Sequence, residues 1–131
     1  MVRFASPVVL AASAGLMIAV APGAAADVTN LSIDPGASWG PSSRYGTTCS
    51  YTLTARTNTA GKVSFYDFTQ AATFSPGHYV DTVDGVATVR WTPTQPGTHA
   101  IMAYQTSAGG PVLTVQVGNG INTGSACLVL P

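Results

Sequence analysis

Histidine, serine and aspartate are the residue types in this chain that could carry hydrolytic chemistry. The chain has two histidines, His78 and His99, and five aspartates but no glutamate. A serine, a histidine and an aspartate can form a nucleophilic triad, but no G-x-S-x-G motif is present to expose the serine. His78 lies in the turn sequence PGHY, where a solvated side chain is the simplest interpretation. The sequence therefore predicts no catalytic residue of this kind.

Acidic side chains offer two further kinds of chemistry. His78, Asp81 and Asp84 could supply mixed metal ligands, but a spacing of three does not keep side chains on one face of a strand. Glycoside hydrolysis needs two acids held at a set separation, whereas Asp34 and Asp84 stand before proline and glycine, as turn residues do. We expect neither an enzyme nor a metal site, and no cofactor.

Aromatic residues give the one candidate binding site. Trp39 and Tyr45, with Arg44 beside them, lie in residues 34–48, a segment rich in glycine, proline and serine (DPGASWGPSSRYGTT). A Trp/Tyr pair in a loop can stack on a sugar ring or anchor a protein interface. In the alternative interpretation, Trp39 fills an open end of the hydrophobic core. The sequence leaves both interpretations open.

Residues 1–26 have the layout of a secretory signal peptide. Arg3 supplies a positive charge, residues 8–20 are almost entirely apolar, and residues 24–26 are alanines that suit a cleavage site. The apolar run is short for a membrane span, although an uncleaved anchor is the alternative. We expect one exported domain, residues 27–131, with no membrane span after cleavage.

The two cysteines, Cys49 and Cys127, both follow the signal peptide. An even number of cysteines in an exported chain indicates a disulfide, and only one internal pairing is possible. Two separate buried thiols are the alternative. The distance between the cysteines and the absence of a nearby histidine give no recognisable zinc-ligand spacing.

Charged residues make up only 8% of the chain, and the formal net charge is zero. This composition excludes a coiled coil and a charge-rich disordered tail. It also speaks against a nucleic-acid partner, because proteins that bind a phosphate backbone carry a basic patch.

Alternating apolar and polar residues, cut by Gly and Pro turns, predict an all-β domain. In residues 49–56 the alternation places Cys49, Tyr51, Leu53 and Ala55 on one face. Asp84-Gly85 is a strong hairpin signal. About seven strands are expected, at residues 28–33, 49–56, 62–66, one or two within 69–83, 85–91, 98–105 and 112–117. Residues 34–48 and 118–126 are expected to be irregular, and Phe65 and Trp91 to lie in the core.

Three segments resemble the strand motifs of bacterial immunoglobulin-like repeat domains. They are residues 61–67 (GKVSFYD), 84–89 (DGVATV) and 96–103 (PGTHAIMA), and they occur in the order that this family shows. The resemblance extends over about residues 50–117. It implies an immunoglobulin-like antiparallel β-sandwich, which in that family is usually a non-catalytic structural or adhesive module outside the cell.

The resemblance also implies roles for single residues. His99 stands where the family places a structural histidine, and Asp67 matches a strand-end aspartate with a turn role. The chain departs from the family in two ways: Gln105 replaces the usual tyrosine, and the chain holds a single copy of a domain that commonly occurs in tandem.

The sequence therefore predicts a secreted or envelope-associated bacterial module that binds a protein or a glycan. One alternative is a carbohydrate-binding module, which would require Trp39, Tyr45 and Tyr79 to form one exposed platform. The other is a secreted hydrolase inhibitor, which would present residues 34–48 as an ordered, protruding loop. In the first alternative these aromatic residues contact a sugar, whereas in the second the loop contacts a hydrolase.

Overall fold

The structure is a computed structural model that describes residues 27–131, and in this part of the chain every regular element is a β-strand. The signal peptide expected at residues 1–26 lies outside the described residues. No helix between residues 27 and 131 is long and apolar enough to cross a membrane. The strands are β2 (Val28–Asp34), β3 (Ser38–Trp39), β4 (Tyr45–Gly46), β5 (Tyr51–Thr57), β6 (Lys62–Asp67), β7 (Ala72–Ser75), β8 (Tyr79–Asp81), β9 (Val86–Pro93), β10 (Gly97–Tyr104), β11 (Val112–Asn122) and β12 (Cys127–Leu130).

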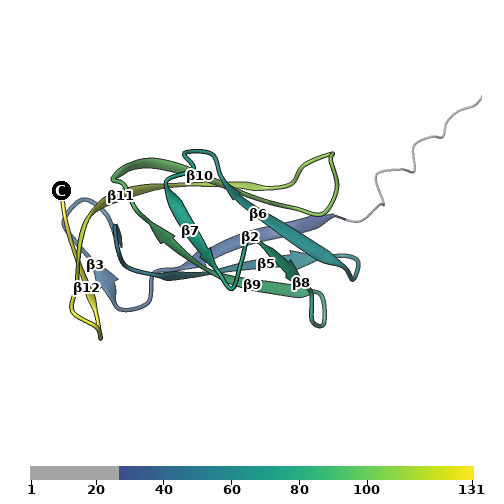
Figure 1. Cartoon of the computed structure of the whole chain (residues 1–131), viewed down its shortest axis with the longest axis horizontal. Helices are drawn as coiled ribbons and strands as arrows, with labels where there is room; N and C mark the ends of the chain where they lie inside the picture. The colour runs from purple at the N-terminus through teal and green to yellow at the C-terminus, as the bar shows by residue number, and fades with distance from the viewer. Residues whose placement is uncertain (1–26) are drawn as a thin grey trace, which may run out of the picture.

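The strands form two sheets that enclose one core (Figure 1). The smaller sheet has the order β2-β5-β9-β7, and all its neighbours are antiparallel. The larger sheet has the order β3-β12-β11-β10-β6-β8, with β4 paired to β11. Each of its two shortest strands pairs in parallel with a longer one: β3 pairs with β12, and β4 pairs with β11. The prediction of an all-β sandwich is confirmed.

The core is built from the inward half of each alternating strand. Leu53 and Trp91 enter it from the smaller sheet, and Val63, Phe65 and Ile101 from the larger one, each with no more than 1% of its surface exposed. Burial alternates along β5, β9 and β10 with the period of two that a half-buried strand requires. The core positions predicted for Phe65 and Trp91, and the buried face that begins at Cys49, are confirmed.

The Asp84-Gly85 turn also forms as predicted. Both residues have positive φ, 54° for Asp84 and 76° for Gly85, which is the backbone of a type I′ hairpin turn. Val83 and Val86 exchange two backbone hydrogen bonds across it. The turn leads the chain from β8, in the larger sheet, to β9 in the smaller one.

Two segments expected to be irregular contain strands. Residues 34–48 hold β3 and β4, and in residues 118–126 strand β11 continues to Asn122 before β12 begins at Cys127. The pairing of β4 with β11 depends on glycine, because a Cβ atom on Gly120 would collide with the backbone at Gly46 and Thr47. Glycine has no side chain that could show alternation, so the sequence pattern missed these pairings.

Candidate functional site

Trp39 is a candidate binding residue whose side chain is exposed. It lies in β3, which pairs in parallel with β12 at one edge of the larger sheet. Its neighbour Ser38 points inward and is 3% exposed, whereas 62% of Trp39 is exposed. The interpretation in which Trp39 fills an open end of the core is wrong, because most of its side chain faces solvent.

Tyr45 faces the other way. Its ring packs edge to face against Tyr51, with ring centroids 5.1 Å apart, and it borders the core. Burial raises the pKa of the Tyr45 hydroxyl above its ordinary value. Arg44 is exposed, and its carbonyl accepts a hydrogen bond of 2.5 Å from Ser38 Oγ. The structure therefore places Trp39 and Arg44 on the surface and leaves Tyr45 partly buried against Tyr51.

The hydroxyl of Tyr51 orders this segment from within the core. Ser38 Oγ donates its proton to the Arg44 carbonyl, so the hydrogen bond of 2.8 Å between Tyr51 and Ser38 uses the proton of Tyr51. The backbone N–H of Gly46 donates to the same tyrosine oxygen at 2.7 Å. One buried hydroxyl thus joins β3, β4 and β5, which explains why the loop is ordered despite its composition.

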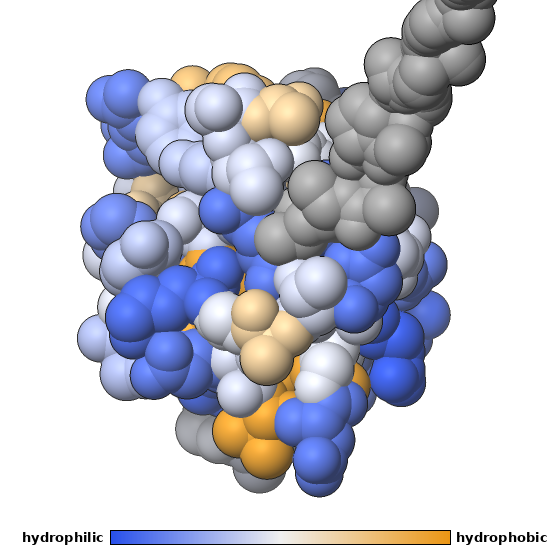
Figure 2. Space-filling view, turned by 90° about the vertical axis from the view of Figure 1, so that its right-hand side faces the viewer, coloured by the Kyte–Doolittle hydropathy of each residue, from blue (hydrophilic) through white to orange (hydrophobic). Residues whose placement is uncertain are grey.

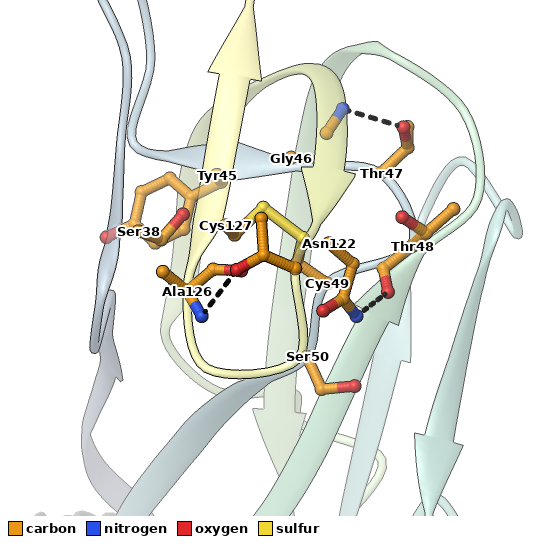
Figure 3. Close-up of a disulfide and its surroundings, with 12 residues drawn as sticks. Ser38, Tyr45, Gly46, Thr47, Thr48, Cys49, Ser50, Asn122, Ala126 and Cys127 are labelled. Carbon is orange, nitrogen blue, oxygen red and sulfur yellow. Dashed lines mark hydrogen bonds between the residues drawn. A yellow bond between two sulfur atoms is a disulfide. The ribbon is translucent and has the colours of Figure 1, made fainter.

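The predicted disulfide between Cys49 and Cys127 is present (Figure 3). It joins Cys49, two residues before β5 of the smaller sheet, to the first residue of β12 in the larger one, with Cα atoms 6.2 Å apart. The Tyr51 hydroxyl lies 3.6 Å from Cys127 Sγ. Because β3 pairs with β12, the disulfide also fixes the strand that carries Trp39.

A cleft of ≈ 310 Å³ lies beside the disulfide. Asp34 is the only carboxylate among the residues that line it, and Asp34 Oδ1 accepts a hydrogen bond from the N–H of Gly36. Arg90, on the same cleft, donates to the Ser50 carbonyl. These residues provide no pairing of a nucleophile with a base. Among the described residues, no three His, Cys, Asp or Glu side chains gather as a metal site would require.

A buried network around Asp67 was not expected from the sequence. Asp67 Oδ2 accepts hydrogen bonds from Trp91 Nε1 at 2.9 Å and from His99 Nδ1 at 2.7 Å. His99 Nε2 lies 2.7 Å from the Gln95 carbonyl, so both ring nitrogens have a hydrogen-bond partner. Asp67 and His99 are at most 2% exposed, and no substrate can reach them. This pair supports the fold, as the resemblance implied for His99.

The pKa of Asp67 reflects two opposing effects. Burial would raise it, but hydrogen bonds from His99, Thr69 and Trp91 outweigh burial and hold it below the ordinary value. The expected turn is also present, since the backbone N–H of Thr69 donates to Asp67 Oδ1. Asp67 follows Val63 and Phe65 at intervals of two, so strand alternation could have predicted its burial.

The outer surface of the larger sheet carries an apolar patch that we name the aromatic face. It extends over β8, β6, β10 and the first half of β11. Register places Tyr79, Ser64 and Tyr104 in one row across three strands, and Tyr66, Met102 and Val112 in the next. Phe68, just beyond β6, packs edge to face on Tyr66 at 5.1 Å. The aromatic face is defined by Tyr66, Phe68, Tyr79, Met102, Tyr104 and Val112.

The outer surface of the smaller sheet has a different composition. Most of its cross-strand neighbours are polar, as on an ordinary solvated sheet, and they include Thr52 opposite Arg90, Thr54 opposite Thr88, and Thr73 opposite Thr92. Hydrophilic residues also cover much of the side of the molecule shown in Figure 2, with smaller hydrophobic patches at its upper edge, centre and lower edge. The outer surface of the smaller sheet is therefore more polar than the aromatic face.

The candidate aromatic residues do not form one platform. Trp39 belongs to β3 and Tyr79 to β8, and these strands are at opposite edges of the larger sheet. Tyr45 contacts Tyr51 inside. Residues 34–48 lie against the sheet through the pairings of β3 and β4, so they do not protrude as an inhibitor loop would. Neither geometry required by the two alternative functions is present.

No family model matches the chain, and no curated protein matches it. Among solved structures, the chain is similar to the D00-D0 domain of Intimin, with a TM-score of 0.55 and 19% sequence identity. The similarity covers 72% of this chain and 48% of that one, so the chain spans about half the length of the matched structure. At this level of identity the similarity establishes the fold. The predicted immunoglobulin-like sandwich is confirmed.

Proposed function

We propose that the chain is an exported, non-catalytic immunoglobulin-like module with a structural or adhesive role at or outside the cell envelope. The disulfide supports export, because such bonds persist in oxidising compartments. The fold supports a non-catalytic role, and the pairing of His99 with Asp67 is buried away from any substrate. The proposed exported form begins at Asp27, the first described residue.

The exposure of Trp39 on a fixed edge strand is the observation that carries this proposal. The strand β3 is held by β12, by the disulfide at Cys127 and by the Tyr51 hydroxyl. Because the strand is already ordered, little backbone entropy is lost when its side chains bind a partner. Tryptophan and arginine are the residue types enriched at interface hot spots. We assign Trp39 and Arg44 as the contact surface and Tyr45 as its support, with a protein or a glycan as the partner.

The test is co-sedimentation of the exported protein with an isolated bacterial envelope fraction. Trp39→Ala removes the proposed anchor, so we expect the dissociation constant to rise by about 30-fold, as loss of a hot-spot residue does. The melting temperature should hardly change, because the side chain is mostly exposed.

Val83→Ala is the matched control. Val83 is also an exposed apolar residue, 71% exposed, but it lies in the turn between β8 and β9, away from β3. Its substitution should leave co-sedimentation unchanged. Wild-type protein that stays in the supernatant, or Trp39→Ala protein that sediments as the wild type does, would show that the proposed function is wrong.

A further inference from the structure

The centre of the aromatic face has the composition of a protein interface. Tyr66, Met102 and Val112 stand side by side across β6, β10 and β11. Interface centres are enriched in aromatic residues and methionine and depleted of charge. Exposed side chains contribute to this face: half of Phe68, 53% of Val112 and 62% of Tyr79 are in contact with solvent. Met102 and Val112 have no flat ring for a sugar to stack on, so this centre suits a protein partner better than a glycan.

The charges on the face are self-complementary. Lys62 and Asp81 lie opposite each other on β6 and β8, and their side chains form an ion pair of 2.8 Å. The outward residues of β10 and the first half of β11 are uncharged. In a two-fold dimer a surface meets its own copy, so a face with net charge would repel itself. This face carries one cation and one anion side by side, so it has no net charge.

The size of the face sets the strength of such a contact. Three strands about 4.8 Å apart and roughly 20 Å long, with the shorter β8 beside them, present about 350 to 500 Å² per copy when side chains are included. Stable complexes bury about 800 Å² per partner, and smaller interfaces belong to weak, reversible complexes. The face is therefore large enough for a dimer that dissociates on dilution.

From the apolar centre, the neutral pair of charges and the area, we infer that the aromatic face binds a second copy of this chain. The two larger sheets pack face to face about a two-fold axis, with Met102 of each copy near the centre of the contact. Strand β3 lies beyond β12 and outside this contact, so the surface at Trp39 stays accessible in both copies. The inference does not depend on the function proposed for Trp39.

Sedimentation equilibrium of the exported protein tests the inference, from about 5 μM to about 1 mM, the range in which an interface of this size should associate. We expect the average mass of the wild type to rise from monomer towards dimer. Met102→Lys places a charge at the centre of both facing surfaces and should weaken dimerisation by at least about tenfold. Val112→Lys makes the same change at an exposed position, in case Met102→Lys disturbs the fold.

Thr88→Lys is the matched control, because it adds the same charge on the exposed outer surface of the smaller sheet. It should dimerise as the wild type does. A wild type that is monomeric at every concentration overturns the inference, as does a folded Met102→Lys or Val112→Lys variant that dimerises normally. If the monomeric wild type instead bound soluble polysaccharide and Val112→Lys did not, the face would belong to a glycan and the inference would again be wrong.

Discussion

At the scale of single residues, the buried carboxylate of Asp67 links the acid stability of the protein to its core. Folding lowers its pKa below the ordinary value of 3.8, so the ionised form stabilises the native state above that value. This contribution is lost as the pH falls through the lowered pKa of the folded state. We expect the free energy of unfolding, measured with urea, to decrease below about pH 4.

Asp67→Asn should remove that part of the acid dependence. It should also lower the free energy of unfolding near pH 7 by about 3 to 5 kcal/mol, because His99 and Trp91 lose a charged acceptor inside the core. Asp34→Asn, at an exposed turn, is the control and should behave as the wild type does. If the free energy of unfolding of Asp67→Asn still falls below about pH 4 as it does in the wild type, other carboxylates cause the fall.

The sequence predicted single residues well where a strand was long enough to alternate. Phe65 and Trp91 were placed in the core from their phase, and the same reasoning extended to Asp67 and His99 would have predicted their burial. It could not have predicted that they meet, because β6 and β10 become neighbours only through the sheet order. The exposure of Trp39 was equally out of reach, since a strand of two residues has no measurable period.

At the scale of elements, predictions failed where a strand depends on its neighbours. The strands β5, β6, β9 and β10 alternate over six to eight residues, and each was predicted within a few residues of its ends. In contrast, β3 and β4 have two residues each, and their parallel pairing with β12 and β11 is a long-range contact. What holds these two strands is the Tyr51 hydroxyl and the disulfide, which no local pattern records.

The disulfide should therefore be a major source of stability. It closes a loop with a sequence separation of 78, and the chain-entropy model gives about 4 to 5 kcal/mol for a loop of that length. We expect reduction, or the double substitution of Cys49 and Cys127 by alanine, to lower the free energy of unfolding by up to that amount. Equilibrium unfolding with and without reductant measures it. Stability that does not change on reduction would mean that hydrogen bonds alone hold β12 in place.

At the scale of the whole molecule, the sandwich has two chemically different outer surfaces. The smaller sheet presents mainly polar side chains to solvent, and the larger sheet presents the aromatic face. Both surfaces come from strands with the same alternation, so the difference is not required by the fold. The largest apolar patch on a soluble protein is often a functional surface, which is why we infer that the aromatic face binds a partner.

Dimerisation through the aromatic face would give one assembly two copies of the surface at Trp39. Two linked contacts bind a densely loaded ligand surface more tightly than one, because the second contact forms at a high effective concentration. We expect the wild type to bind a dense layer of envelope material at least about tenfold more tightly than Met102→Lys does. On a sparse layer, where only one contact forms at a time, the two proteins should bind equally. Surface plasmon resonance at two immobilisation densities measures both cases. If the ratio of the wild-type affinity to the Met102→Lys affinity is the same at both densities, the two surfaces at Trp39 do not act together, even in a dimer.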